Sequence, residues 1–290
     1  MDGIIVLNKP AGFTSMDCCA VIRRICGEKK AGHTGTLDPN ATGVLPVCLG
    51  KATRLIEYMD GSPKQYRCQC QLGKTTDTQD IWGKILTESS FQVTRQEIET
   101  VLASFLGEIE QIPPAYSAVK INGKKLYQYA REGQRVEVPS RKVTIHRIDL
   151  IAWEAQKGTF TFDILCSRGT YVRTICADLG NRLGCGAVMT ALVRTSACGY
   201  DLSEAVSLDV LKDEGPEKYL RPVESAVSFL PSLQLSEWQA HLFVNGVSDF
   251  VRNQDPSDRR TFSVWKDKIL LGTAAMNEDG ILKVCKVLRQ

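Results

Sequence analysis

Residues 65–72 (Gln-Tyr-Arg-Cys-Gln-Cys-Gln-Leu) alternate strictly, as a half-buried strand requires. Further strands are predicted at 3–7, 44–49, 143–151, 159–166 and 187–200, and helices at 15–26, 52–59, 94–106 and 171–183. These strands and helices do not follow one another in regular alternation. The sequence therefore predicts an α+β fold with a mixed, largely antiparallel central sheet flanked by helices, rather than a doubly wound parallel sheet.

A change of composition near the C-terminus predicts a second, smaller domain. The segment 202–231 is polar and acidic, and after residue 233 short apolar runs are separated by turn-forming residues. The turns are predicted at Asn245-Gly246, Asp255-Pro256 and Glu278-Asp279-Gly280. We therefore expect one large domain over 1–230 and a small β-rich domain over 233–290.

The composition is that of a soluble globular protein, with 43% hydrophobic and 24% charged residues. No apolar run approaches the roughly 20 residues that cross a bilayer, and residues 1–4 do not resemble a signal peptide. We expect a cytoplasmic protein. The 11 cysteines include no Cys-x-x-Cys pair, and Cys68 and Cys70 on one strand face are too few for a metal site. Reduced thiols packed in the core are the expected state.

Basic residues cluster in the segment 120–147, which holds eight of them against two acids. The segment therefore carries +6, whereas the whole chain carries only +3. A local basic segment on a nearly neutral protein indicates a polyanion bound at one place. The alternative is a solvated charged face without a partner.

The segment 32–43 combines one carboxylate and one imidazole with three glycines. Glycine allows another molecule to approach the backbone closely. Asp38 precedes Pro39, which disfavours the helical region, so we expect Asp38 on a loop. Taken alone, Asp38 could be an ordinary turn residue, and His33 could be a satisfied surface or core histidine.

The order of residues in this segment carries a family resemblance. The run G-H-T-G-T-L-D-P-N-A-T-G-V-L-P-V from Gly32 resembles the catalytic loop of the TruB family of tRNA pseudouridine synthases. Four further segments resemble motifs of that family in the same order: Lys9–Ser15, Lys64-Gln65-Tyr66, Pro113–Ala118 and Ser167–Thr174. The resemblance covers about residues 3–225. It implies the pseudouridine synthase fold, followed by a PUA-like RNA-binding domain that 233–290 matches in size and β character.

The resemblance implies a role for each site residue. Asp38 is the essential carboxylate, which either attacks the sugar at C1′ or helps to remove the C2′ proton, and the sequence leaves both routes open. Arg173 is implied as its bidentate partner. Tyr66 stacks on the target base and takes part in proton transfer, while Tyr171 and Leu192 form the base pocket. For Leu192, plain core packing is the competing interpretation.

The remaining residues are implied to serve RNA binding or support. His33 fills the RNA stack after the target uridine has swung out, and Lys9 and Pro10 support the catalytic loop. The basic segment 120–147 becomes an RNA-gripping insertion that closes over the T stem-loop of tRNA, beginning at an Asn122-Gly123 turn. Its expected RNA-binding residues are Lys120, Lys124, Lys125, Arg131, Arg141 and Lys142. Tyr127 or Tyr129 is expected to pack on sugar or base.

The predicted activity is isomerisation of the T-loop uridine at tRNA position 55, without guide RNA, metal or cofactor. We expect a monomer without an obligate protein partner. Three alternatives are weighed against this activity. A guide-RNA-dependent relative usually carries extra N-terminal sequence and long basic tails, a non-catalytic RNA-binding module would not need Asp38, and a glycosidase commonly uses paired carboxylates, of which this loop offers one.

Overall fold

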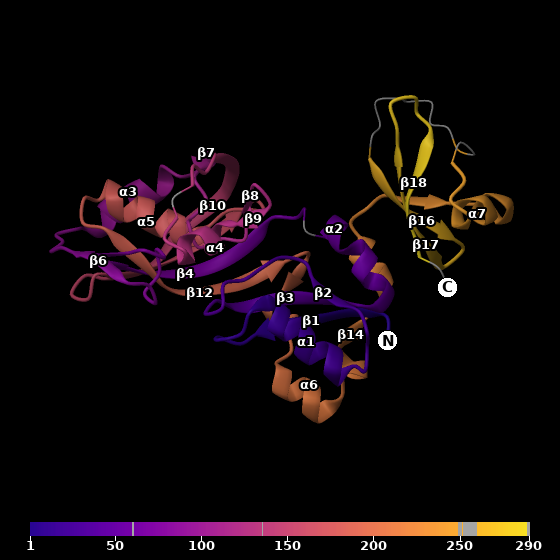
Figure 1. Ribbon diagram of the computed structural model, residues 1–290, viewed down its shortest axis with the longest axis horizontal. Helices are drawn as coiled ribbons and strands as arrows, with labels where there is room; N and C mark the ends of the chain where they lie inside the picture. Colours follow the sequence, from indigo (N-terminus) through magenta and orange to yellow (C-terminus); the bar gives the residue numbers. More distant parts are fainter. Residues whose placement is uncertain (60, 135, 249–250, 252–259, 289–290) are drawn as a thin grey trace.

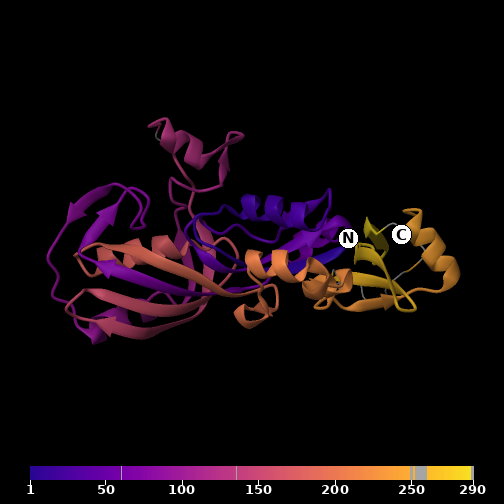
Figure 2. The ribbon, with the colours of Figure 1, turned by 90° about the horizontal axis from the view of Figure 1, so that it is seen from below.

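A computed structural model describes residues 1–290 except 60, 135, 249–250, 252–259 and 289–290. It contains a large N-terminal body built on one long sheet and a smaller C-terminal body, which lie end to end (Figure 1). The two ends of the described chain lie near the junction of these bodies (Figure 2).

The central sheet has ten strands among the described residues, with the main order β14-β1-β3-β12-β4-β11-β10-β7. The short strands β2 and β13 pair with β3 and β12. The strands are β1 (Gly3–Lys9), β2 (Ala31–His33), β3 (Thr42–Leu49), β4 (Lys64–Leu72), β7 (Gly107–Gln111), β10 (Arg141–Glu154), β11 (Thr159–Cys166), β12 (Ala187–Ala197), β13 (Tyr200–Asp201) and β14 (Leu220–Arg221). The alternating segment at 65–72 is central strand β4, with every second residue buried.

The strands β3 and β12 form the one parallel pair that the described part of this sheet contains. Their contact is short, with Thr42 opposite Val193 and Gly43 opposite Arg194. Gly43 has φ +100°, and a β-carbon there would lie 2.2 Å from the Arg194 carbonyl oxygen. Only glycine allows so close an approach of the two backbones. This contact is called the seam below, because it joins the two antiparallel halves of the sheet.

Helices cover both halves of the sheet. They are α1 (Ser15–Ile25), α2 (Ile56–Met59), α3 (Arg95–Ala103), α5 (Val172–Arg182) and α6 (Leu208–Glu214), with 3-10 turns η1 (Gly50–Leu55), η2 (Leu202–Glu204), η3 (Pro216–Tyr219) and η4 (Val223–Val227). Helices α3 and α5 share a core with β4, β10 and β11, whereas α1 and α6 pack on β1 and β3. Helix α1 begins at a capping box in which the Thr14 hydroxyl and the Asp17 carboxylate each accept a backbone N–H of the other residue.

Two hairpins extend from this body. One consists of β5 (Lys74–Thr76) and β6 (Ile85–Glu88). The other is formed by β8 (Lys120–Ile121) and β9 (Lys124–Lys125), which turn through Asn122 and Gly123 at positive φ, and it continues into α4 (Leu126–Arg131). Residues 120–134 stand away from the sheet and are called the arm (Figure 2).

The C-terminal body is a four-stranded sheet with one helix. Its elements are β15 (Ser232–Gln234), α7 (Glu237–Val244), β16 (Thr261–Lys266), β17 (Ile269–Met276) and β18 (Leu282–Val287). Gly246 and Gly280 adopt positive φ at two of the predicted turns, while Asp255-Pro256 lies outside the described residues. None of the helices in the described chain is long and apolar enough to cross a membrane.

The α+β prediction with a mixed, largely antiparallel sheet flanked by helices is confirmed, and so is the β-rich C-terminal body. The prediction of one helix over 52–59 is only partly right, because residues 50–55 form a 3-10 turn and α2 is limited to Ile56–Met59. Segment 32–43 is not a loop throughout, since Gly32 and His33 belong to β2 and β3 begins at Thr42.

Candidate active site

A cleft of about 930 Å³ brings together residues from distant parts of the chain. Its walls come from the Asp38 loop (residues 34–41), β4, β12, the start of α5 and the arm. The predicted site residues that line it are His33, Asp38, Tyr66, Lys125, Arg131, Arg141, Tyr171, Arg173 and Leu192. The cleft therefore collects both the proposed catalytic residues and part of the basic segment.

Asp38 lies outside regular secondary structure on a loop that is held from several sides. The Ser15 hydroxyl accepts the Leu37 N–H at 2.9 Å and lies 3.3 Å from the Leu37 carbonyl. The Gly12 N–H donates to the Pro39 carbonyl at 2.9 Å. Contacts on both sides of Asp38 thus fix its backbone position.

Two fully buried cations bind the same loop, Lys9 and Arg194. The Lys9 ammonium donates to the carbonyls of Pro10 at 2.9 Å and Pro39 at 2.8 Å, and burial lowers its pKa. Arg194 donates from Nε to the Val44 carbonyl at 2.7 Å and from Nη2 to the Gly35 carbonyl at 3.2 Å. Arg194 was not predicted from the sequence, where its only signal is that it is the one charged residue in the run that forms β12.

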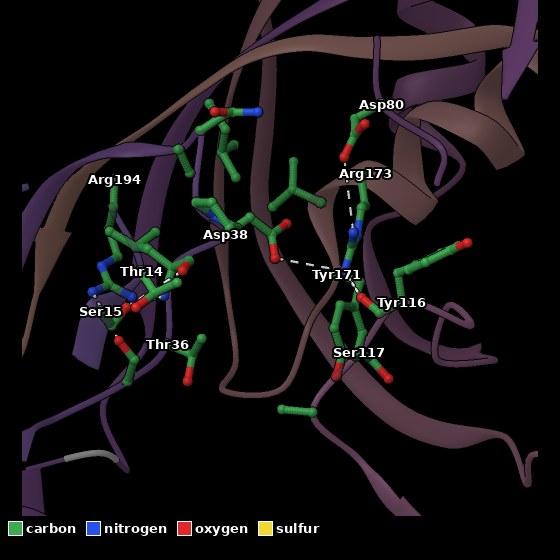
Figure 3. A pocket seen from close by; sticks show the side chains of 18 of the residues that line it. Thr14, Ser15, Thr36, Asp38, Asp80, Tyr116, Ser117, Tyr171, Arg173 and Arg194 are labelled. Carbon is green, nitrogen blue, oxygen red and sulfur yellow. Dashed lines mark hydrogen bonds and ion pairs between the residues drawn. The ribbon is translucent and has the colours of Figure 1, made fainter. Parts of the chain in front are cut away.

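Arg173 extends from the first turn of α5 toward Asp38 (Figure 3). Its Nη2 lies 3.5 Å from Asp38 Oδ1, and its Nη1 lies 3.9 Å from Asp80 Oδ2. Nη2 also donates to the Tyr116 carbonyl at 2.6 Å. The prediction of a bidentate Arg173–Asp38 pair is therefore wrong for this structure, because the guanidinium is shared among three acceptors.

Asp80 is a second carboxylate in the cleft that the sequence analysis missed. It lies in the turn between β5 and β6, where its Oδ1 accepts the Thr78 hydroxyl at 2.6 Å and the Trp82 N–H at 3.1 Å. Nothing in the turn-rich sequence around it distinguishes it from an ordinary turn residue. Only the fold reveals its contact with Arg173.

The electrostatics of Asp38 follow from these neighbours. Burial raises the pKa of the Asp38 carboxyl, the positive charge of Arg173 opposes that rise, and the negative charge of Asp80 adds to it. The ionised form of Asp38 therefore depends on Arg173. A half-buried carboxylate facing a cation across 3.5 Å can act as a nucleophile or as a proton acceptor.

Three apolar or aromatic side chains lie near this pair. Tyr66 on β4 and Leu192 on β12 are both buried. Burial raises the pKa of the Tyr66 phenol, an effect that the charge of Arg194 partly offsets. Tyr171 immediately precedes α5, and its ring lies 5.8 Å from the Arg173 guanidinium and 5.9 Å from that of Arg141. These groups suit a planar ring bound beside Asp38.

His33 lines the cleft from strand β2. Its Nδ1 accepts the Gly35 N–H at 3.3 Å, which fixes the imidazole near the start of the Asp38 loop.

The basic segment is divided between the arm and the sheet. Lys120, Lys124, Lys125 and Arg131 belong to the arm, whereas Arg141 and Lys142 belong to β10. The expected boundary of the insertion at about 120–147 is therefore wrong at its C-terminal side, because the chain rejoins the sheet at Arg141. Lys142 pairs with Glu108 at 2.8 Å. Arg135, which counted toward the basic segment, lies outside the described residues.

All eleven cysteines are free thiols. The fold adds Cys176 of α5 to Cys68 and Cys70, and their sulfurs lie within 4.8 Å of one another in the core. Among the described residues no further histidine, cysteine or carboxylate joins this group. Burial raises the pKa of Cys68 and Cys70 well above the usual value, so these thiols remain protonated and pack as apolar groups.

Comparisons with known proteins identify the family of this chain. Residues 23–172 match the family model described as TruB family pseudouridylate synthase (N terminal domain), and residues 173–228 match the model of the tRNA pseudouridylate synthase B C-terminal domain. The tRNA pseudouridine synthase B of Geobacillus thermodenitrificans is 46% identical over 256 residues, which are 85% of each chain. That of Clostridium perfringens is 40% identical over 285 residues, 97% of each chain.

A solved structure titled as a Cbf5-Nop10-Gar1 complex contains a chain of similar fold, with a TM-score of 0.74 and 26% identity. The similarity covers 99% of the present chain and 85% of that chain. The match to the family model spans more than half of the chain, and curated relatives exceed 40% identity over most of its length. The protein belongs to the TruB family of pseudouridylate synthases.

Proposed function

We propose that this protein converts the T-loop uridine at position 55 of tRNA to pseudouridine, without guide RNA. The single observation that carries the proposal is a half-buried Asp38 carboxylate held 3.5 Å from the buried Arg173 guanidinium in a cleft of about 930 Å³. Relatives of 40–46% identity are named tRNA pseudouridine synthase B, whereas the chain from the Cbf5 complex is only 26% identical. These identities favour a tRNA substrate over a guide-dependent one.

The reaction requires the bond between N1 and C1′ to break and a new bond to form between C5 and C1′. Asp38, ionised beside Arg173, either attacks C1′ and forms a bond that breaks again when C5 attacks C1′, or removes the C2′ proton and returns it when C5 adds to C1′. Either route frees the uracil, which rotates within the cleft until C5 faces C1′. After the new bond has formed, C5 loses its proton and N1 gains one, so the product is an isomer of the substrate. No group is gained or lost, so the atoms balance without a second substrate.

The cleft must also hold the uracil while it is detached. Tyr66 stacks on the ring, and Leu192 and Tyr171 enclose it. Extruding a base from folded RNA costs a few kcal/mol, and the imidazole of His33, which lines the cleft, replaces part of the lost stacking. The arm, with Lys120, Lys124, Lys125 and Arg131, closes over the RNA backbone, and the C-terminal body adds a PUA-like RNA-binding surface.

The decisive experiment incubates the protein with an unmodified tRNA transcript and separates the nucleosides after digestion. We expect pseudouridine at position 55 with the wild type, and a decrease of at least about a thousandfold with Asp38→Asn. Asp209→Asn is a matched control, because Asp209 is an exposed carboxylate on α6. Conversion by Asp38→Asn at the wild-type rate would disprove the mechanism.

The same assay distinguishes the alternative activities. A non-catalytic RNA-binding module would bind the transcript without forming pseudouridine, and a glycosidase would release free uracil. A glycosidase usually needs a second carboxylate to activate water. Asp80 is poorly suited to that task, because its Oδ1 already accepts two hydrogen bonds and its Oδ2 faces Arg173.

A further inference from the structure

The chain that leads into the arm contacts the catalytic arginine and its neighbour directly. This segment, Gln111–Ser117, is called the root. Gln111 is the last residue of β7, and its side chain is buried. Its amide Nε2 donates to the Tyr171 carbonyl at 3.1 Å, and its Oε1 accepts the Tyr171 N–H at 2.7 Å. Gln111 thus binds both backbone polar groups of one residue.

Tyr171 is the residue from which α5 starts, and it has no side-chain cap of its own. Arg173 follows two residues later, so the direction of its side chain depends on how the first turn of α5 is held. Gln111 supplies that restraint from β7. The two polar atoms of this buried amide both bind Tyr171. Together they fix the position and the orientation of the Tyr171 backbone.

The root also contacts the guanidinium itself. The Tyr116 carbonyl accepts Nη2 of Arg173 at 2.6 Å, which is shorter than the 3.5 Å from the same nitrogen to Asp38. Arg173 Nε and the Ser117 hydroxyl are both buried, and neither has a hydrogen-bond partner among the residues that the structure describes. The root and Asp38 therefore share one nitrogen of Arg173, and the root makes the closer contact (Figure 3).

The other end of the arm returns to the same place. Arg141, the first residue of β10, lies over the Tyr171 ring at 5.9 Å. Gln111 holds the Tyr171 backbone from the chain that leads into the arm, and Arg141 contacts its ring from the chain that leaves it. A displacement of the arm is therefore transmitted to Tyr171 through both chain segments, the one that ends in Gln111 and the one that begins at Arg141.

We propose that the root is a coupling element and Gln111 a positioning residue, through which the position of the arm sets the pairing of Arg173 with Asp38. This proposal rests on the proposed function. When the arm closes on RNA, the Tyr116 carbonyl moves with the root and releases Nη2 to Asp38. The catalytic pair is then completed only on bound substrate, and Gln111 keeps the start of α5 in place during the change.

The test compares Gln111→Met, which removes both hydrogen bonds at similar length, with Gln111→Glu, which accepts the Tyr171 N–H but cannot donate to its carbonyl. Gln71→Met is the matched control, because Gln71 on β4 also donates to a backbone carbonyl, that of Lys157. For Gln111→Met we expect the single-turnover rate of pseudouridine formation to fall about tenfold, the rate equivalent of two neutral hydrogen bonds. We expect the Kd for tRNA to change less than about twofold, and an intermediate rate for Gln111→Glu.

A pH profile separates positioning from a general loss of structure. The charged groups that face Asp38 are Arg173, Asp80 and Lys9. If Gln111→Met displaces Arg173, Asp38 loses a cation that favours its ionised form, so the acid limb of the rate profile moves to higher pH. A double-mutant cycle with Lys125→Ala in the arm should be non-additive, because both changes act through the root.

Each outcome has one meaning. Pseudouridine formation by the wild type tests the proposed function separately from the root. With an active wild type, a slower Gln111→Met enzyme with a shifted acid limb and a non-additive cycle supports the coupling. A wild-type rate in both Gln111 variants overturns it, and so does a lower rate with an unchanged pH profile. If Gln111→Met fails to fold, the same criteria apply to Gln111→Glu.

Discussion

Lys9 and Arg194 are individual residues whose burial has a clear energetic consequence. Both cations satisfy backbone carbonyls of the chain around Asp38 rather than carboxylates. Lys9→Met would leave the Pro10 carbonyl without the Lys9 donor and the Pro39 carbonyl with the Gly12 N–H alone. An orphaned acceptor costs about 1–3 kcal/mol, so we expect the free energy of unfolding to fall by about 1–3 kcal/mol in urea denaturation.

The rate of pseudouridine formation by Lys9→Met should fall together with its stability, because the Pro39 carbonyl adjoins Asp38. Lys51→Met is the control, since Lys51 is exposed and its pair with Asp2 is a surface one. Equal stability of Lys9→Met and the wild type would show that the Asp38 loop does not depend on this cation.

The carboxyl of Asp38 gives a second prediction at the residue scale, concerning stability and pH. Its pKa in the folded protein is raised above the usual 3.8, mainly by burial. The folded state therefore binds its proton more tightly than the unfolded state, and stability is lost as pH rises from 3.8 through the folded pKa. Asp38→Asn removes the ionisable carboxyl and therefore this loss of stability.

We expect Asp38→Asn to have a higher Tm than the wild type at pH 7, with a difference that narrows toward pH 4. Thermal unfolding of both proteins across this range measures the effect. A variant that is less stable at pH 7 would mean that attraction by Arg173 outweighs the cost of burial.

The residue scale also shows what a sequence can predict about a site. Asp38 and Arg173 stand in runs whose residue order is specific, so resemblance located them. Asp80 and Arg194 lie in a turn and a strand that resemble many others, and their importance arises from contacts with residues 93 and 159 positions away. The division of the Arg173 guanidinium between Asp38, Asp80 and the Tyr116 carbonyl could not be predicted, because it depends on contacts that only the fold brings together.

The arm is an element whose charge is only partly available to RNA. Lys124 pairs with Glu132, and Lys124, Lys125 and Arg131 also lie near the rings of Tyr129 and Tyr127. Lys125 lines the cleft. We expect Lys125→Ala to weaken tRNA binding and to reduce the slope of log K against log salt by about one, as loss of one phosphate contact would.

The control for that titration is Lys157→Ala, because Lys157 is an exposed lysine that pairs with Glu154 at the far end of β10. It should leave the salt dependence unchanged. If Lys125→Ala keeps the wild-type slope, the arm does not contact the RNA backbone through this residue.

Elements differed in how well the sequence revealed them. Strand β4 and helix α1 follow from local patterns, alternation in the first and a capping box in the second. The two-residue strands β13 and β14 have no local pattern, since they exist only through their partners β12 and β1. The end of the arm was misplaced for a similar reason: Arg141 and Lys142 continue the basic run, but pairing with β7 makes them strand residues.

At the scale of the whole molecule, the C-terminal body shares a core with the N-terminal body. Leu270 on β17 packs in the cluster that contains Ala52, Leu55 and Met59, whereas the next residue, Leu271, packs inside the C-terminal body. Arg54 also donates to the Val287 carbonyl at 2.5 Å. The two leucines are equally buried, so they form a matched pair.

We expect Leu270→Ala and Leu271→Ala each to cost about 2–5 kcal/mol. Leu270→Ala should also increase hydrogen exchange in η1 and α2, while Leu271→Ala should confine its effect to the C-terminal body. Hydrogen exchange followed by mass spectrometry measures both. Identical exchange patterns in the two variants would show that the bodies do not stabilise each other through this cluster.

The seam has a consequence for how the protein is made. Strand β12 lies between β3 and β4, so a ribosome must synthesise almost 200 residues before the sheet can close. Asp38 has no Arg173 until residue 173 has been made, and until β12 is made it lacks Arg194 and Gly43 has no backbone opposite it. Contacts across such long stretches of chain form slowly. A nascent polypeptide therefore carries the proposed catalytic carboxylate through much of its synthesis without the two cations that surround it in the folded protein, and the proposed RNA chemistry is reserved for the completed N-terminal body.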